Sequence, residues 1–201
     1  MVKSLNRPGG NITGIAFQTV ELTAKRLGML RELAPQATRF AALVDPAYAF
    51  TDGLIKDAQG SAAALGLPIE ILRASTVGEI DAAFVKIAQA SNAALLVSPN
   101  AFFTARRAQL ATLAARYAIP TIYPIREFAD AGGLISYGPN FLDVYRQTGH
   151  YVTRILKGEK PGDLPIMQPT KFELTINLTT ARAVGITIPN TLLALADVVI
   201  E

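Results

Sequence analysis

The sequence predicts an α/β fold, a flavodoxin-like parallel sheet flanked by helices. Three apolar runs of about five residues each, at 93–97, 119–123 and 134–137, have the length and composition of strands that are buried on both faces. Residues 107–117, between the first two runs, are long enough for a crossover helix. Because strands and helices alternate along most of the chain, the strands are expected to run parallel and to connect by right-handed crossovers.

The same alternation describes the chain before residue 90. A polar turn at 8–10 leads into a short strand-like run at 11–17, and leucines near helical spacing predict a helix over 20–33 that ends before Pro35. The further elements are strands at 40–44 and 69–72 and helices at 51–65 and 79–89, the last with Ser75 or Thr76 as its N-cap.

Beyond residue 140 the pattern changes. Apolar residues at helical spacing predict a longer helix over 141–157, followed by a stiff connector at 161–169 that is rich in proline. Residues 172–178 alternate apolar and polar side chains, which predicts an edge strand with one wetter face. The chain ends with a short helix capped by Thr179 or Thr180, a helical turn that starts at Pro189 and an apolar run at 198–200.

Composition indicates a globular chain with ample material for a core. Half of the 201 residues are hydrophobic, and the net charge of +3 comes from 19 basic and 16 acidic residues scattered without a block. Because no basic patch is present, we expect no nucleic-acid partner. The absence of cysteine excludes disulfides, thiolate catalysis and cysteine-ligated metal sites.

Motifs of known enzymes are few. The sequence has no G-x-S-x-G elbow, no phosphate-binding G-x-x-x-x-G-K-[ST] loop and no H-E-x-x-H, and no acidic cluster has the spacing of metal ligands. The one histidine, His150, lies within a predicted helix and far in sequence from any serine that could act as a nucleophile. We therefore predict that the protein is not an enzyme and that it uses no cofactor and no metal.

Polar and aromatic residues follow the predicted buried strands. In open parallel sheets the carboxyl ends of the strands line the ligand crevice, so these residues are the first candidates for binding a small molecule. The candidates are Phe17, Asp45, Ser98, Asn100, Phe102, Tyr123, Tyr137 and Asn140.

Several candidates also have a purely structural explanation. Asp45 follows a strand, as the phosphoacceptor of a receiver domain does, but the accompanying acidic pair and lysine are absent, and Asp-Pro is a common turn. Ser98 and Asn100 could hold a ligand carboxylate or could cap the next helix. Phe102 could stack on a flat ligand or belong to the core. The arginines that offer anion recognition or a solvated surface are Arg106, Arg107 and Arg126.

Several strings of the sequence resemble a known family. They include RPGGNITG at 7–14, KRL at 25–27 with LRELAP at 30–35, REF at 126–128, GGLISYGPN at 132–140 and QPTKFEL at 168–174. In this order they resemble the substrate-binding proteins of ABC transporters in the TrpX-like group, and the resemblance covers nearly the whole chain. It implies a periplasmic-binding-protein fold of type I, in which two flavodoxin-like lobes joined by three crossovers hold a small ligand in the cleft between them.

The resemblance also implies that the chain is an N-terminally truncated fragment with a complete second lobe and a partial first lobe. Members of the family carry a signal or lipoprotein peptide and most of the first lobe ahead of the RPGGN string, so the complete protein is expected to be periplasmic or a membrane-anchored lipoprotein. The expected parts are a first-lobe remnant and crossover at 1–36, the second lobe at 37–124, a first-lobe remnant at 125–160, and a crossover with return to the second lobe at 161–201.

On this resemblance we expect the solute-binding component of an ABC importer. It would capture an amino acid or a related aromatic or carboxylated molecule and deliver it to the permease, and an incomplete cleft would bind that ligand more weakly. Exposed apolar faces of the first-lobe remnant would favour a homo-oligomer. The alternatives are a ligand-sensing domain of a regulator with the same fold and a flavodoxin-like enzyme, which turnover or bound flavin would reveal.

Overall fold

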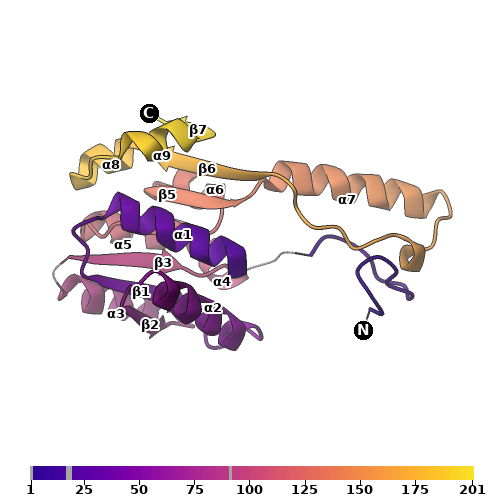
Figure 1. The fold of residues 1–201 in the computed structure, drawn as a ribbon, viewed down its shortest axis with the longest axis horizontal. Coiled ribbons are helices and arrows are strands. Elements are labelled where there is room, and N and C mark those ends of the chain that lie inside the picture. Colours follow the sequence, from indigo (N-terminus) through magenta and orange to yellow (C-terminus); the bar gives the residue numbers. More distant parts are fainter. Residues whose placement is uncertain (1, 17–19, 91) are drawn as a thin grey trace. The chain divides into compact units, whose positions relative to one another are not determined.

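The chain forms two compact units. The computed structural model describes residues 2–16, 20–90 and 92–201 (Figure 1). Unit 1 is made from Met1–Gln18 and Pro139–Phe172, and unit 2 from Thr19–Gly138 and Glu173–Glu201. Each unit is therefore assembled from segments that are far apart in the sequence.

Unit 2 is built on a single sheet with the strand order β2-β1-β3-β4-β5-β6-β7. Pairs β1–β2, β1–β3, β3–β4, β4–β5 and β6–β7 are parallel. The first five strands follow the order 2-1-3-4-5 of flavodoxin-like folds, so the predicted fold class is confirmed. The strands are β1 (Arg39–Val44), β2 (Ile69–Arg73), β3 (Ala93–Val97), β4 (Thr121–Tyr123), β5 (Ile135–Pro139), β6 (Phe172–Asn177) and β7 (Val198–Ile200).

Strand β6 is not the edge strand that its alternating sequence predicted. It lies between β5 and β7. Backbone hydrogen bonds run from Asn177 N to Leu134 O (2.9 Å) and from Asn140 N to Lys171 O (3.0 Å), which sets β6 antiparallel to β5. Two polar residues of the alternation, Thr175 and Asn177, are buried rather than exposed to solvent, and the amide of Asn177 donates to the carbonyl of Ala129 at 3.0 Å.

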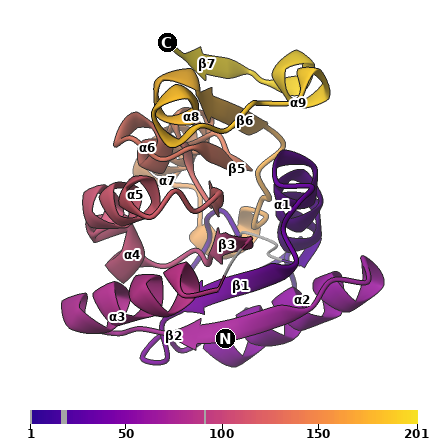
Figure 2. The same ribbon diagram turned by 90° about the vertical axis from the view of Figure 1, so that its left-hand side faces the viewer.

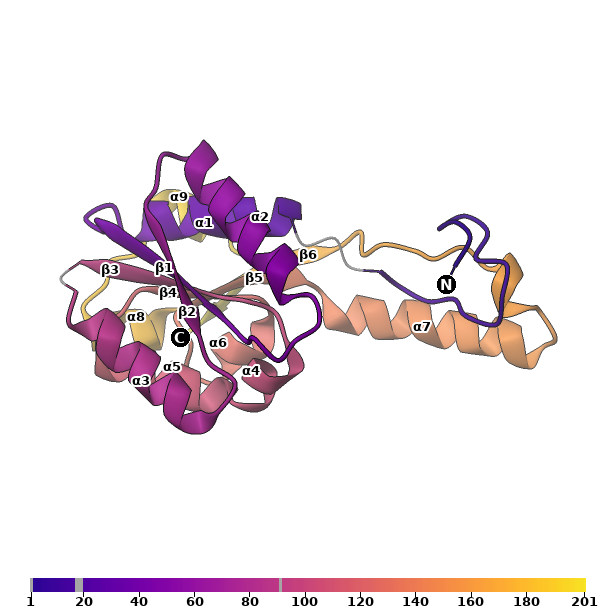
Figure 3. The same ribbon diagram turned by 90° about the horizontal axis from the view of Figure 1, so that it is seen from below.

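Helices cover both faces of this sheet (Figures 2 and 3). One face packs against α1 (Val20–Leu33), α2 (Thr51–Ala64) and α9 (Asn190–Leu195), whose apolar residues form one core cluster with the strands. The other face packs against α3 (Val77–Ala88), α4 (Ala101–Ala105), α5 (Arg107–Arg116) and α6 (Arg126–Asp130), which form a second cluster. Helix α8 (Leu178–Val184) follows β6.

Side-chain caps fix where several helices begin. Thr76 and Glu79 form a reciprocal capping box at the start of α3, as the sequence predicted. The predicted caps of α8, Thr179 and Thr180, are wrong, because α8 begins earlier. Its cap is Asn177, whose Oδ1 accepts from the backbone N–H of Thr180 at 2.9 Å.

Unit 1 consists of α7 (Phe141–Leu156), a short 3₁₀ helix (Pro161–Asp163) and two extended segments that run beside each other. Ile15 and Met167 form a parallel β-bridge, and the backbone N–H of Gly9 donates to the carbonyl of Gly162 at 3.1 Å. The hydroxyl of Thr13 donates to Leu164 O at 2.8 Å. These contacts tie the N-terminal segment to the proline-rich connector.

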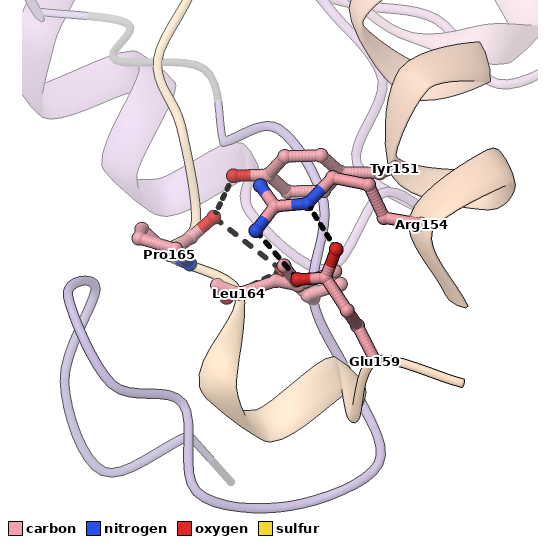
Figure 4. Close-up of polar contacts among 6 residues, drawn as sticks. Tyr151, Arg154, Glu159, Leu164 and Pro165 are labelled. Atoms are coloured by element: carbon pink, nitrogen blue, oxygen red, sulfur yellow. Dashed lines mark hydrogen bonds and ion pairs between the residues drawn. The ribbon is translucent and has the colours of Figure 1, made fainter. Parts of the chain in front are cut away.

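Helix α7 also contacts this connector (Figure 4). The hydroxyl of Tyr151 donates to the carbonyl of Pro165 at 2.6 Å. Arg154 binds the carboxylate of Glu159 through two hydrogen bonds, at 2.8 and 2.6 Å. Because these bonds join the helix to the turn that follows it, α7 and the connector pack together as one unit.

The two compact units divide the chain at other positions than the lobes expected from the resemblance. We expected α1 in the first-lobe remnant and crossover at 1–36 and β5 in the first-lobe remnant at 125–160, and most of both elements lies in unit 2. The physical reason is burial: Leu27 and Leu30 of α1 and Ile135 of β5 belong to the same core cluster as the central strands. Which lobe of a complete protein each unit represents stays a prediction.

Within the described residues, no helix combines the length and the apolar character needed to cross a bilayer.

Candidate functional site

The candidate site of unit 2 lies where the strand order reverses. Strands β1 and β3 are neighbours in the sheet, but the chain leaves β1 for β2 on one side and leaves β3 for β4 on the other. The two connections therefore diverge outside the carboxyl ends of β1 and β3, which is the position where open α/β sheets generally bind ligands. Asp45 follows β1 directly, and Ser98 and Asn100 follow β3.

Asp45 and Asn100 contact each other across this switch point. Asn100 Nδ2 donates to Asp45 Oδ2 at 3.0 Å, and the backbone N–H of Ala47 donates to Asp45 Oδ1 at 2.9 Å. Asn100 Oδ1 accepts from the backbone N–H of Phe103 at 2.7 Å and so caps α4. Each carboxylate oxygen can accept a second hydrogen bond, which leaves Asp45 able to take a donor from a ligand.

The loop between β1 and α2 is also held by Asp45. The backbone N–H of Tyr48 and the hydroxyl of Thr51 both donate to the carbonyl of Asp45. The loop carries two exposed aromatic rings, Tyr48 and Phe50, in an edge-to-face contact with centroids 5.4 Å apart. Phe50 is 69% exposed, so the loop presents an apolar surface beside the Asp45–Asn100 pair.

The side chain of Ser98 faces helices α1 and α2 rather than solvent. Its residue is 6% exposed, and its hydroxyl has no hydrogen-bond partner in the described part of the chain. It lines a cavity of about 10 Å³ together with Thr23 and Arg26 of α1 and Leu54 and other apolar residues of α2, β1 and β3. Ser98 therefore does not cap α4, and its side chain lies on the face of the sheet that α1 and α2 cover.

Arg26 is the buried cation of the site. Its Nε donates to Tyr137 O at 2.7 Å and its Nη2 to Pro124 O at 3.1 Å, so it links the ends of β4 and β5. Burial lowers the pKa of Arg26 to about 10, because the charged form loses its hydration. Lys25 donates to the hydroxyl of Tyr137 at 2.7 Å and lies 4.4 Å from the centre of its ring. Two cations thus lie at this edge of the sheet.

Tyr123 does not reach the site. Its side chain is completely buried on the other face of the sheet, stacked on Phe128 with ring centroids 4.9 Å apart, and its hydroxyl donates to Leu110 O at 3.4 Å. Burial raises its pKa, because the phenolate would lose its hydration there. We therefore do not retain Tyr123 as a ligand-binding residue.

The remaining candidates are placed as follows. Phe102 is half-buried in α4 and packs against Phe103, with ring centroids 5.6 Å apart. Asn140 belongs to unit 1, where its Oδ1 accepts from Asp143 N at 2.9 Å and caps α7. Phe17 lies outside the described residues.

The other predicted arginines lie at the surface. Arg107 donates to Thr104 O at 3.1 Å, and Arg126 pairs with Asp130 at 3.4 Å, both partly in solvent. In the ranges that the structure describes, no group of three or more His, Asp or Glu side chains is arranged to hold a metal ion.

Sequence reasoning missed Lys25, Arg26, Tyr48 and Phe50. A signal for Arg26 was present, because Arg26 interrupts the apolar stripe of Leu22, Leu30 and Leu33 at helical spacing. A charge on the buried stripe of a helix calls for partners in the core.

Comparison with known proteins supports the resemblance found in the sequence. A model of the family described as ABC transporter substrate binding protein matches residues 1–200. No curated protein sequence matches the chain.

Three solved structures share the fold over almost the entire chain. An ABC domain from Streptococcus pneumonia in complex with L-Trp is 24% identical, with a TM-score of 0.86 over 99% of this chain and 68% of that one. A conserved domain protein from Vibrio cholerae is 25% identical, with a TM-score of 0.88 over 98% and 66%. The ligand-free, open substrate binding protein CD0873 from Clostridium difficile is 21% identical, with a TM-score of 0.73 over 100% and 66%.

The chain thus spans about two thirds of the length of these structures. The family model covers its length to within one residue, and the parallel α/β fold agrees with that match. This chain belongs to the family of ABC transporter substrate binding proteins.

Proposed function

We propose that the complete protein is the solute-binding component of an ABC importer, which holds a small organic ligand and delivers it to a membrane permease without altering it. The observation that carries this proposal is the Asp45–Asn100 pair at the switch point of a parallel sheet. The family match supports the same function, because a substrate binding protein must capture and release its solute intact.

The ligand that best fits the site is an amino acid or a related aromatic, carboxylated molecule. Asp45 supplies acceptor positions for an ammonium group, and Lys25 and Arg26 make the same edge favourable for a carboxylate. Tyr48, Phe50 and the half-buried Phe102 add aromatic surface. The complex of the Streptococcus pneumonia relative with L-Trp agrees with this class.

Binding of tryptophan can be measured directly, because this chain contains no tryptophan. The indole of the ligand is then the only indole in the sample, and its fluorescence anisotropy reports the bound fraction. A panel of amino acids that compete for binding gives the specificity. If neither this chain nor the complete protein binds tryptophan or any member of the panel, the proposed function is wrong.

The Asp45→Asn variant tests the role of the carboxylate. An amide oxygen can still accept from the backbone N–H of Ala47, but the negative charge is lost. Removing a charge-assisted hydrogen bond to an ammonium group costs about 2 kcal/mol, or roughly 30-fold in Kd. The matched control is Glu32→Gln, which makes the same change of charge in the last turn of α1, where the hydroxyl of Thr191 donates to Glu32. Equal affinities for the two variants would remove Asp45 from the site.

Ser98, Tyr137 and Asn140 enter the proposal with different roles. Ser98 lines the small cavity at the end of β3, and Tyr137 accepts a hydrogen bond from Lys25, so both are proposed to hold the strand ends in place. Asn140 begins α7 of unit 1, so any contribution that it makes comes from that unit.

The complete protein is proposed to act outside the cytoplasmic membrane, in the periplasm or as a lipoprotein. Ligand would favour its closed state only through contacts that the open state lacks. Cell fractionation tests the location, and uptake of labelled ligand in a deletion strain tests the link to a permease.

Self-association is a further part of the proposal. Helix α7 exposes large apolar side chains at helical spacing on one side. An exposed apolar face of this kind favours burial against a second copy. The side chains are Leu142, Tyr145, Val152 and Leu156. Light scattering should show a dimer that Leu156→Glu weakens, whereas a monomer at high concentration would refute the association.

A further inference from the structure

A larger cavity of unit 2 lies at the amino ends of the strands, at the edge of the sheet opposite to the Asp45–Asn100 pair. Its volume is about 320 Å³, which falls within the range of pockets that hold small molecules. Since a molecule of liquid water occupies about 30 Å³, the space equals that of about ten water molecules. The lining comes from the ends of α1, α3, α5 and α8 and from the loops that follow them.

These four helices all end at the cavity. The three longest, α1, α3 and α5, have 14, 12 and 10 residues. The C-terminal end of a helix carries a partial negative charge, because its last carbonyls have no partner within the helix. Among the residues that the structure describes, none donates a hydrogen bond to the carbonyl of Ala88, Tyr117 or Val184, which line the cavity at three of the four ends. The helix ends therefore favour a positive charge in this space.

The side chains of the lining leave that charge unopposed. No Lys, Arg, His, Asp or Glu of the described residues lines the cavity. Ala34, Ile87 and Ile119 are buried and form its apolar floor, while Gln36 and Asn92 are exposed and supply amide groups at its rim. A cation with an apolar body would therefore find both a favourable potential and an apolar contact surface.

An aromatic ring belongs to the same lining. Tyr117 is half-buried, and the guanidinium carbon of Arg116 lies 5.6 Å from the centre of its ring. The ring thus already attracts a cation. Aromatic faces bind methylated ammonium groups through the same attraction between a positive charge and the ring electrons.

The lining also contains a left-handed backbone position that is not glycine. Ala118 has a φ of 50°, and the N–H groups of Ala118 and Ile119 donate to Ala115 O at 3.1 Å and Ala114 O at 2.9 Å. This pattern closes α5 in a Schellman motif. Helix α8 closes in the same way with Gly185, where the conformation has no steric penalty. Alanine adds only a methyl group at the cavity and carries the penalty that glycine avoids.

We propose that this cavity is a second binding site of the protein, for a small organic cation of the methylated ammonium class, such as choline. The positive charge of the ligand is stabilised by the helix ends, and its methyl groups contact the ring of Tyr117 and the apolar floor. The inference does not rest on the proposed solute, because the two sites lie at opposite ends of the same parallel strands.

Titration calorimetry with choline tests the charge. The neutral compound 3,3-dimethyl-1-butanol has the shape of choline with carbon in place of the ammonium nitrogen, and it should bind at least tenfold more weakly. Saturating tryptophan and the Asp45→Asn variant should both leave choline affinity unchanged. Absence of choline binding, equal affinity for the neutral compound, or displacement of choline by tryptophan would each overturn the proposal.

Two substitutions at the end of α5 should act in opposite directions. Tyr117→Leu removes the aromatic face and should weaken choline binding several-fold. Arg116→Gln removes a competing cation from the last turn of the helix and should strengthen binding several-fold. Arg107→Gln is the matched control, because it makes the same change of charge at the first residue of α5 and should leave affinity unchanged. Weaker or unchanged binding in Arg116→Gln would refute the electrostatic argument.

The Ala118→Gly variant separates binding from stability. Glycine relieves the left-handed strain and should raise the urea midpoint by roughly 0.5 M. Because the methyl group is lost from the cavity, choline affinity should fall a few-fold at the same time. A residue with a structural role alone would change stability and leave affinity as it is. Unchanged affinity in both Ala118→Gly and Tyr117→Leu would rule out this cavity as the binding site.

Discussion

Replacing Gly138 by alanine should be among the most damaging small substitutions in the protein. A Cβ at this position would lie 1.9 Å from the carbonyl oxygen of Pro124 and 3.0 Å from its carbonyl carbon. Both clashing atoms are backbone, so no side-chain rotation relieves the contact. The two strand ends must separate by about 1 Å to reach the closest approach of real Cβ atoms, 3.0 Å.

That separation acts on the Arg26 bridge. Pro124 O accepts from Arg26 Nη2 at 3.1 Å, and Tyr137 O, next to Gly138, accepts from Nε at 2.7 Å. Overpacking costs about 1–3 kcal/mol, and weakening a hydrogen bond to a charged donor adds about 1.5–3 kcal/mol. We therefore expect Gly138→Ala to lower the free energy of unfolding by roughly 3–5 kcal/mol.

Urea denaturation measures this loss. With a slope of about 2 kcal/mol per molar urea, the midpoint should fall by about 2 M. The matched control is Gly60→Ala in α2, where a Cβ meets no atom within 4 Å. There the same chemical change should raise stability by about 0.5–1 kcal/mol, since alanine favours the helix. Midpoints that move together in the two variants would refute the close-contact argument.

Three other predictions rest on single side chains. Asn177→Ala should cost about 2 kcal/mol in urea denaturation, because α8 loses its cap and the carbonyl of Ala129 loses its donor. Asn177→Asp keeps the acceptor that caps α8 and loses only the donor to Ala129 O, so it should cost less. Equal losses in the two variants would show that the cap does not contribute to stability. Tyr151→Phe should cost about 1 kcal/mol by removing the bond to Pro165 O, measured as faster proteolysis of unit 1. Unchanged proteolysis would show that the bond does not hold the connector. Burial raises the pKa of Tyr123, so the unfolded chain releases this proton near pH 10 while the folded chain retains it. Stability should therefore fall as the pH rises above about 10, less steeply in Tyr123→Phe, and complete reversible titration of all six tyrosines in the folded chain would refute its burial.

The local elements could be predicted because their signals lie within a few residues. The helix at 20–33 and the strand at 93–97 were predicted with the boundaries that the structure shows. Their signals were leucine spacing with a terminating proline and a five-residue apolar run. The place of β6 inside the sheet could not be predicted, because a buried amide and a solvated one look alike in an alternating sequence.

The candidate site was only partly accessible to the same reasoning. The strand-end rule brought Asp45 and Asn100 together, since both follow parallel strands that turn out to be neighbours. It failed for Tyr123, because a strand buried on both faces has no alternation to reveal which face each side chain takes. Arg26 was missed because its partners, Pro124 and Tyr137, lie about 100 residues further along the chain.

The sequence by itself determined the class of fold, the positions of most helices and strands, and the family resemblance that the comparisons confirmed. Those properties depend on the spacing of apolar residues and on turn-forming residues, which act over one or two turns of chain. Only the tertiary structure decided the division into two units, the burial of Tyr123 and Arg26, and the cavity under Ser98. These depend on which distant surfaces meet, and burial and hydrogen bonding between distant segments leave no pattern in the local order of residues.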